Sequence, residues 1–203
     1  IDVIENGLSA SIGFDFKNNI LNEDGSFGRQ NFSISAGQVI SERENMDIPS
    51  STSLDQKFSD VVGEVVYNAT DNLDLSYNFS IDQNYKELNY NEIGADFTYG
   101  KTNFNINYLE EKKHIGNQEY IKSDLDLEIG QNTALSFSAK RNLQTNSAEF
   151  YNLSYDYIND CLKAGIAYRR EFYTDRDIEP NNSLMFTITI VPFGKVNSPT
   201  IGK

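Results

Sequence analysis

The sequence predicts an all-β fold, an antiparallel up-and-down meander of about eleven strands. Large apolar residues alternate with small polar or acidic ones along most of the 203 residues, most clearly in LDLSYNFSI at residues 73–81. Because successive side chains of a strand point to opposite faces, such a run has one apolar and one polar face. The runs recur about every dozen residues, as strands do in a meander. No stretch of the chain has a helical period.

Each predicted strand is a run in which apolar residues recur at every second position. In chain order these runs are Gly7–Lys17, Phe27–Ile40, Ser59–Asn68, Leu73–Asp82, Leu88–Tyr99, Thr102–Leu109, Glu119–Ile129, Thr133–Leu143, Ala148–Tyr157, Leu162–Tyr173 and Ser183–Phe193. Most are about 10 residues long, which is the length that a tilted strand needs to cross a bilayer. The strand lengths therefore favour the wall of a transmembrane β-barrel.

The connections alternate between short turns and longer, more charged links. The short turns, at residues 22–25, 69–72, 100–101, 130–132 and 159–160, carry the Gly, Asn and Asp that tight hairpins need. The longer links are residues 41–58, 83–87, 110–118, 144–147 and 174–182. In a membrane barrel the short turns face the periplasm and the long loops face outside. A soluble sandwich has no reason to keep this alternation.

The two strand faces predict two different environments. The apolar face is expected to meet lipid, and its clearest set is Leu73, Leu75, Tyr77, Phe79 and Ile81. The opposite face is acidic and is expected to form a hydrated lumen wall of Asp74, Asp82, Glu92, Asp96, Asp124, Asp126 and Glu128, because carboxylates in a dry core would each cost several kcal/mol. The three alternate carboxylates at 124–128 could also hold divalent cations, but a solvated wall is favoured. The remaining alternative is a soluble sandwich or large barrel with the Phe and Leu side chains in a core.

Composition excludes several classes of function. The 17 basic and 30 acidic side chains give a formal charge of −13, which argues against a nucleic-acid partner. No apolar run is long enough for a membrane-spanning helix. His114 is the only histidine and lies in a charged link, and no G-x-S-x-G motif is present, so no enzyme and no cofactor is predicted. The chain starts at Ile1 without Met or signal peptide, so we expect a processed or truncated piece.

Two neighbouring strands carry a more specific signal. FSDVVG at residues 58–63, followed by LDLSYNF at 73–79, resembles the C-terminal barrel region of the LptD family, the lipopolysaccharide (LPS) assembly proteins of the outer membrane. Residues 35–38 resemble the preceding strand of that family. Residues 155–157, 160–162 and 168–170 resemble its cysteine-bearing hairpin, and Ser183–Phe193 resembles its closing strand. The resemblance covers about residues 30–195.

The resemblance implies a place in a much larger protein. LptD proteins have a very large barrel preceded by a periplasmic jelly-roll domain, so residues 1–195 are expected to be the C-terminal segment of the barrel and residues 196–203 a periplasmic tail. The implied function is transport of LPS into the outer leaflet of the Gram-negative outer membrane through a barrel that opens sideways. The implied partners are LPS, an LptE-type plug lipoprotein, a periplasmic LPS bridge protein, the outer-membrane barrel assembly machinery and the lipid bilayer. The alternative is a general porin or nutrient-uptake barrel.

The resemblance also implies two local roles. Cys161, the only cysteine, lies where the family has cysteines bonded to its N-terminal periplasmic region, so a disulfide to a cysteine outside this chain is expected; a small buried hydrophobe is the alternative. The strand with Leu184, Phe186, Ile188, Ile190 and Pro192 is expected to be the last barrel strand and one lip of the lateral gate. Pro192 has no N–H to donate, so it either weakens the hydrogen bonding between strands at that point or simply ends the strand.

Overall fold

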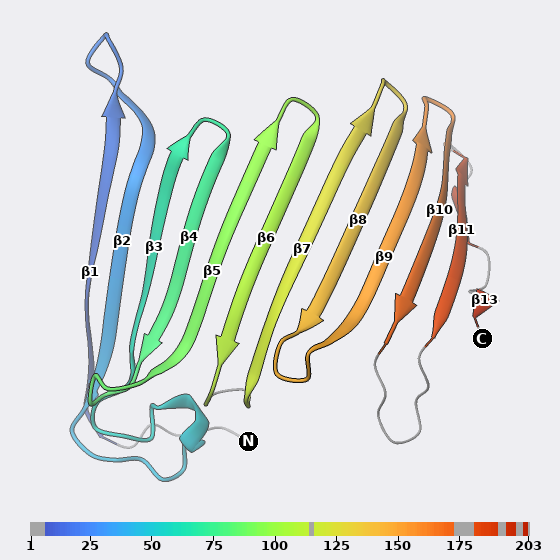
Figure 1. Ribbon diagram of the computed structural model, residues 1–203. Helices are drawn as coiled ribbons and strands as arrows, with labels where there is room; N and C mark the ends of the chain where they lie inside the picture. The colour runs from blue at the N-terminus through green and yellow to red at the C-terminus, as the bar shows by residue number, and fades with distance from the viewer. Residues whose placement is uncertain (1–6, 114–115, 173–180, 191–193, 198–200, 203) are drawn as a thin grey trace. The chain divides into compact units, whose positions relative to one another are not determined.

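Eleven long strands, formed by the runs that alternate in the sequence, make up the computed structural model. It describes residues 7–113, 116–172, 181–190, 194–197 and 201–202. The strands are β1 (Ser9–Leu21), β2 (Phe27–Ser41), β3 (Val61–Thr70), β4 (Leu73–Ile81), β5 (Leu88–Tyr99), β6 (Thr102–Glu111), β7 (Gln118–Ile129), β8 (Thr133–Asn142), β9 (Ser147–Ile158), β10 (Leu162–Glu171) and β11 (Asn182–Ile190). A short 3-10 helix, η1 (Ser50–Thr52), lies between β2 and β3 (Figure 1).

The strands are hydrogen-bonded in chain order, each to the next, which confirms the predicted antiparallel meander. Among the described strands, β1 has β2 as its single neighbour, so the sheet does not close on itself within this chain. Two short strands follow the predicted last strand. These are β12 (Gly194–Asn197) and β13 (Ile201–Gly202), and both pair with β11. They lie in and beside the predicted tail, and Pro192 lies outside the described residues.

The chain divides into two compact units, which we describe separately. The first unit comprises residues 1–95 and 108–119, and the second comprises residues 96–107 and 120–203. In the first unit, register places Phe14 opposite Ala36 and Phe16 opposite Ile34. Continuing across the sheet, Ile34 lies opposite Val65, and Val65 lies opposite Tyr77. Directly opposed residues share a face, so these side chains form one apolar face.

The second unit repeats the pattern. On one face Leu125 lies opposite Phe137, Phe137 opposite Leu153, and Leu153 opposite Tyr168. On the other face Asp124 lies opposite Ser138 and Asp126 opposite Ser136. A register slip of one residue would move every apolar side chain to the polar face. The alternation in the sequence therefore excludes a slip by one residue, and the short turns fix the register among the pairings that remain.

The turn residues take the backbone conformations that the sequence predicts. Gly25, Gly100 and Gly130, each in a short turn, have φ of 79°, 59° and 73°. Only glycine adopts this region without a steric cost. In the first turn the hydroxyl and backbone N–H of Ser26 donate to Asp24 Oδ1 at 2.6 and 2.9 Å. These hydrogen bonds hold the pKa of the Asp24 carboxyl below its ordinary value.

The apolar face is exposed, and no hydrophobic side chain is buried among the described residues. Phe14 and Phe16 on β1 are 57% and 54% exposed, and Tyr168 on β10 is 41% exposed. A soluble sandwich of this length would bury such side chains against a second sheet. No helix in the described part of the chain is long and apolar enough to cross a membrane.

Candidate functional site: the polar strand face and the loop fastened to it

The predicted acidic wall falls into two parts, one in each unit. In the first unit Asp74 is exposed on β4, and Glu92 on β5 accepts hydrogen bonds from Asn78 Nδ2 at 3.2 Å and from the Tyr90 hydroxyl at 2.7 Å. Asp82 lies one residue beyond β4, where its carboxylate accepts from the backbone N–H and the side chain of Asn84. Its local role is therefore to cap a turn, and its place in a lumen wall stays a prediction.

The second unit holds the other four acidic residues. Asp124, Asp126 and Glu128 occupy alternate positions of β7 and share one face. Asp124 accepts from Ser138 Oγ at 2.6 Å and pairs with Lys122 at 2.9 Å, and Glu128 pairs with Lys101 at 3.4 Å. Asp96 accepts from Asn105 Nδ2 at 2.6 Å. Within the described residues no three carboxylate, histidine or cysteine side chains come close enough to hold a metal ion.

The set predicted to meet lipid lies on one face of β4. Register places Ile81 opposite Val61, Phe79 opposite Gly63, Tyr77 opposite Val65 and Leu75 opposite Tyr67, while Leu73 begins the strand opposite Thr70. The rings of Tyr77 and Phe79 stack with their centroids 5.6 Å apart. This face is apolar across the strand pair, and its contact with lipid stays a prediction.

The long link between β2 and β3 is fastened to β2 by backbone hydrogen bonds. Ser41 N–H donates to Lys57 O at 2.8 Å, and Ser59 N–H donates to Val39 O at 2.9 Å. Glu42 N–H donates to Leu8 O at 2.8 Å, which connects the link to the residue before β1. We call residues 42–58 the β2–β3 loop. Its backbone is folded as a compact unit of its own, as in an Ω-loop.

A buried network around Asp60 joins this loop to the polar face. Asp60 is 2% exposed, and its Oδ2 accepts from Asn89 Nδ2 at 2.6 Å and from Ser80 Oγ at 3.2 Å. Lys113 Nζ lies 3.7 Å from Asp60 Oδ1. The backbone N–H of Asp60 donates to Ser53 Oγ of the loop at 3.1 Å. Asp60 therefore holds the loop, β4, β5 and the link after β6 together.

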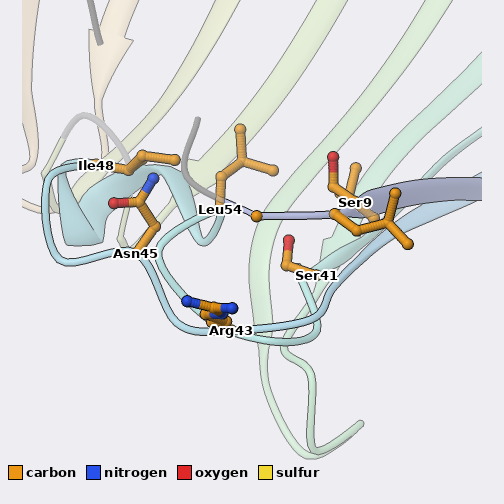
Figure 2. A pocket seen from close by; sticks show the side chains of 9 residues that line it. Ser9, Ser41, Arg43, Asn45, Ile48 and Leu54 are labelled. Atoms are coloured by element: carbon orange, nitrogen blue, oxygen red, sulfur yellow. The ribbon is translucent and has the colours of Figure 1, made fainter. Parts of the chain in front are cut away.

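The β2–β3 loop lies over the polar face of the first strands. A hollow of about 410 Å³ is lined by Thr52, Ser53 and Leu54 of the loop together with residues of β1–β3. A smaller cavity of about 30 Å³ lies where Ile48 and Leu54 approach Ser9 and Ser41 (Figure 2). The smaller cavity has room for little more than one water molecule. Residues of the β2–β3 loop line both hollows.

Sequence reasoning did not find the Asp60 network. The sequence pattern places Ser59 and Asp60 at the start of a predicted strand and within a family motif, and it gives Ser80, Asn89 and Lys113 no separate role. The available signal was a polar cluster at strand ends beside the longest link. That signal is weak, because the five residues of the network, Ser53, Asp60, Ser80, Asn89 and Lys113, are spread over 61 positions and meet only through strand pairing.

We expect Asp60→Ala to release the β2–β3 loop without unfolding the sheet. Removing the carboxylate leaves the buried Asn89 and Ser80 donors without this acceptor, at a cost of about 1–3 kcal/mol. Trypsin should then cut at Arg43 or Lys57 several times faster in the folded protein. Asp82→Ala is the matched control, because among the described residues the Asp82 carboxylate accepts hydrogen bonds from Asn84 alone, within its own turn. Equal cleavage of both variants would contradict the fastening role.

The predicted gate strand, β11, pairs with β10 on one side. Leu184 lies opposite Tyr168, Phe186 opposite Ile166, Ile188 opposite Ala164 and Ile190 opposite Leu162. Its other edge pairs with β12 over Thr187–Ile190 and with β13 over Ser183 and Leu184. The edge predicted to form a gate is thus taken up by short strands from the end of the chain. Its role as a gate stays a prediction.

Comparison with known families decides what kind of protein carries these features. The family model described as LptD, LPS transport system D, matches residues 1–133. The chain belongs to the LptD family. The matched LptD stretch includes both motifs on which the resemblance rests and extends to the first residue of β8, while Cys161 and β11 lie beyond it. No curated protein matches the chain.

Membership of the LptD family connects the chain with LPS transport and with the outer membrane. LPS is accordingly the substrate of the machinery to which the chain belongs. The family is one of transport and assembly proteins rather than enzymes. The exposed apolar strand faces and the all-β meander are what an outer-membrane protein requires.

Proposed function

We propose that this chain forms part of the wall of an outer-membrane barrel that delivers LPS into the outer leaflet and opens sideways at β11. The observation that carries the proposal is the separation of faces in each unit. One face exposes Phe, Leu, Ile and Tyr side chains, and the other exposes carboxylates and amides. A strand wall with lipid on one side and water on the other needs this division.

The link lengths support one orientation in the membrane. The links after β2, β4, β6 and β10 have 6 to 19 residues, and those after β3, β5, β7 and β9 have two or three. The links after β1 and β8, with five and four residues, are the exceptions to this alternation. In an antiparallel meander successive links lie at opposite ends of the strands (Figure 1). The long links would then face the outside and the short turns the periplasm.

The polar face would serve the hydrated part of the cargo. Sugars of LPS carry many hydroxyls, and the carboxylates and amides of this face can accept and donate hydrogen bonds to them. The same face is the surface available to a plug lipoprotein of the LptE type. A periplasmic LPS bridge protein would deliver the cargo, and the barrel assembly machinery would insert the wall.

The general-porin alternative is favoured by one observation, the fold of the β2–β3 loop over the polar face. A porin uses such a loop to narrow its lumen. In an LPS transporter the same loop would keep the lumen closed to small solutes between transport events. Family membership favours the second reading, and the distinction is measurable.

The proposed function is tested by depleting the full-length protein from cells that depend on it and then expressing it again. Depletion should stop the appearance of new LPS at the cell surface, as read by surface labelling, before permeability to small solutes changes. Re-expression of the intact protein should restore display. If depletion left LPS display normal and reduced only solute uptake, the porin reading would replace this one.

Cys161 provides a second test. It is exposed in the short turn between β9 and β10, where its backbone N–H donates to Asn159 Oδ1 at 3.0 Å. Its thiol is therefore accessible, and at the periplasmic end of the barrel it would meet an oxidising compartment. We expect a disulfide to a cysteine elsewhere in the full-length protein, which would stabilise by about 4–5 kcal/mol in the chain-entropy model.

The disulfide is measured on a non-reducing gel of the full-length protein, with Cys161→Ser as the control. The wild-type band should shift on reduction, and the variant band should not. If the wild-type thiol alkylates completely without a reductant, Cys161 is free and the expectation fails.

A further inference from the structure

Basic side chains gather at one end of the second unit, in a chain with a formal charge of −13. Lys122 lies opposite Lys140 on neighbouring strands, and Arg141 follows directly. Arg169 and Arg170 lie two strands away, near the end of β10. The end concerned is the one from which the β8–β9 and β10–β11 links leave. It is therefore the end that the orientation argued above places at the outer leaflet.

At this end of the second unit, the three cations on the polar face each form an ion pair within the chain. Lys122 Nζ lies 2.9 Å from Asp124, Lys140 Nζ 2.8 Å from Glu149, and Arg169 Nε 2.8 Å from Glu171. Lys140 also lies over the Tyr120 ring at 4.1 Å, and Arg169 lies over the Phe150 ring at 5.1 Å. These three positions need no further counter-ion.

Arg141 and Arg170 belong to the opposite, apolar face. Arg170 follows Ile166 and Tyr168 at alternate positions of β10 and lies opposite Tyr151. Arg141 follows Phe137 and Ala139 on β8, and the regular β7–β8 register fixes its face. Both arginines are exposed, and in the part of the chain that the structure describes neither has a carboxylate within ion-pair distance.

A row of aromatic rings lies beside Arg170. The Arg170 guanidinium lies 4.7 Å from the centroid of the Phe172 ring, which meets Tyr151 edge-on at 5.4 Å. Tyr151 in turn stacks on Phe137 at 6.4 Å. Arg141 Nη2 donates to Asn146 Oδ1 at 2.6 Å, which holds the side chain and leaves its other donors available. Such rings belong to the level of lipid headgroups.

We propose that Arg141 and Arg170 form a binding site for the phosphate groups of an LPS molecule in the outer leaflet, on the lipid-facing side of the wall. Strand spacing puts their Cα atoms about 12 Å apart, so the two long side chains can reach one headgroup from two sides. A guanidinium presents a planar fork of donors that matches a phosphate. The proposal rests on the proposed function, because it takes this face to be lipid-facing.

Two exposed cations on an apolar surface, neither with a carboxylate partner among the described residues, favour an anion at the boundary between lipid and water. The headgroup of the lipid that fills this leaflet supplies one. The occupant would be a lipid resting against the wall, separate from LPS that passes along the polar face.

The test measures lipid retention by the purified full-length protein in detergent. Native mass spectrometry follows the bound fraction of diphosphorylated lipid A and of the same lipid A stripped of its phosphates. We expect each of Arg141→Gln and Arg170→Gln to weaken binding of the phosphorylated lipid by about tenfold, and the double variant by more. Double replacement by Lys keeps the charge but not the fork and should give an intermediate loss. Wild type should show a similar loss when the lipid phosphates are removed.

Arg169→Gln is the matched control, because it removes one positive charge from the neighbouring residue on the opposite face. It should leave retention unchanged, and unaltered heat-modifiable gel migration should verify that every variant is folded. Equal losses in Arg169→Gln and Arg170→Gln, or equal retention of both lipids by the wild type, would overturn the site. Retention requires no transport, so it is read independently of LPS display. A failure of the proposed function would appear in the display assay alone.

Discussion

Cells whose barrel is covalently locked at β11 should stop displaying new LPS. The lock is a disulfide between Met185→Cys, a position of β11 that the described residues of β12 and β13 do not face, and a cysteine introduced at the facing position of the first strand of the complete barrel, in a Cys161→Ser background. If β11 is one lip of the gate, LPS must pass between these two strands to enter the leaflet. The expected effect is a near-complete loss of surface labelling, restored by reductant.

The control for this lock joins β11 to β10 instead. Met185 lies opposite Ala167, so Met185→Cys with Ala167→Cys forms a cross-link of the same kind across a seam that need not open. Cells with the control lock should display LPS at the normal rate. Normal display in cells with the first lock would refute the gate role of β11 and leave the wall itself unaffected.

Placing a charge on the apolar face should destabilise the folded protein far more than the same charge on the polar face. Leu75 and Ser76 are neighbours on β4, with Leu75 opposite Tyr67 and Ser76 opposite Val66. Near the bilayer midplane an arginine on the lipid side costs about 2–4 kcal/mol, whereas one in a hydrated lumen costs much less. We therefore expect Leu75→Arg to lose about 2–4 kcal/mol of unfolding free energy and Ser76→Arg to be much milder.

The measurement is equilibrium unfolding of the full-length protein in lipid vesicles, followed by gel mobility or tyrosine fluorescence. The pair of variants controls for the charge, the size of the side chain and the strand, because only the face differs. Similar destabilisation of the two variants would contradict the assignment of faces.

The positions of the strands could be predicted from the sequence alone, because the alternation of apolar and polar residues is a local pattern that recurs along the chain. A strict alternation such as that of residues 73–81 fits one local structure, and a slip of one residue would expose the wrong side chains on both faces. The short turns were predictable from local sequence as well, because Gly25, Gly100 and Gly130 can adopt the positive φ that these turns require.

What the sequence could not give depends on residues that are distant along the chain. Asp60, Asn89 and Lys113 meet only after several strands have paired. The prediction extends one strand from Leu73 to Asp82, whereas the observed strand β4 ends at Ile81. Asp82 instead accepts a hydrogen bond from Asn84 and begins a turn. The pairing of β12 and β13 with β11 was missed because four-residue and two-residue strands carry no measurable alternation.

The difference between cations that have a carboxylate partner among the described residues and those that have none there was also beyond sequence reasoning. Arg169 and Arg170 are neighbours in the chain, yet one has Glu171 at 2.8 Å and the other lies against an aromatic ring. Alternation along β10 assigns them to opposite faces. The carboxylate partner becomes visible only when the side chains are placed.

The central claim is that one face of these strands meets lipid and the other meets water. Spin labels at Leu75→Cys and Ser76→Cys of the full-length protein in a bilayer, in the Cys161→Ser background, test it directly. The label at 75 should be relaxed by oxygen, which concentrates in lipid, and the label at 76 by a water-soluble nickel complex. Equal access of both reagents at the two positions would contradict the claim.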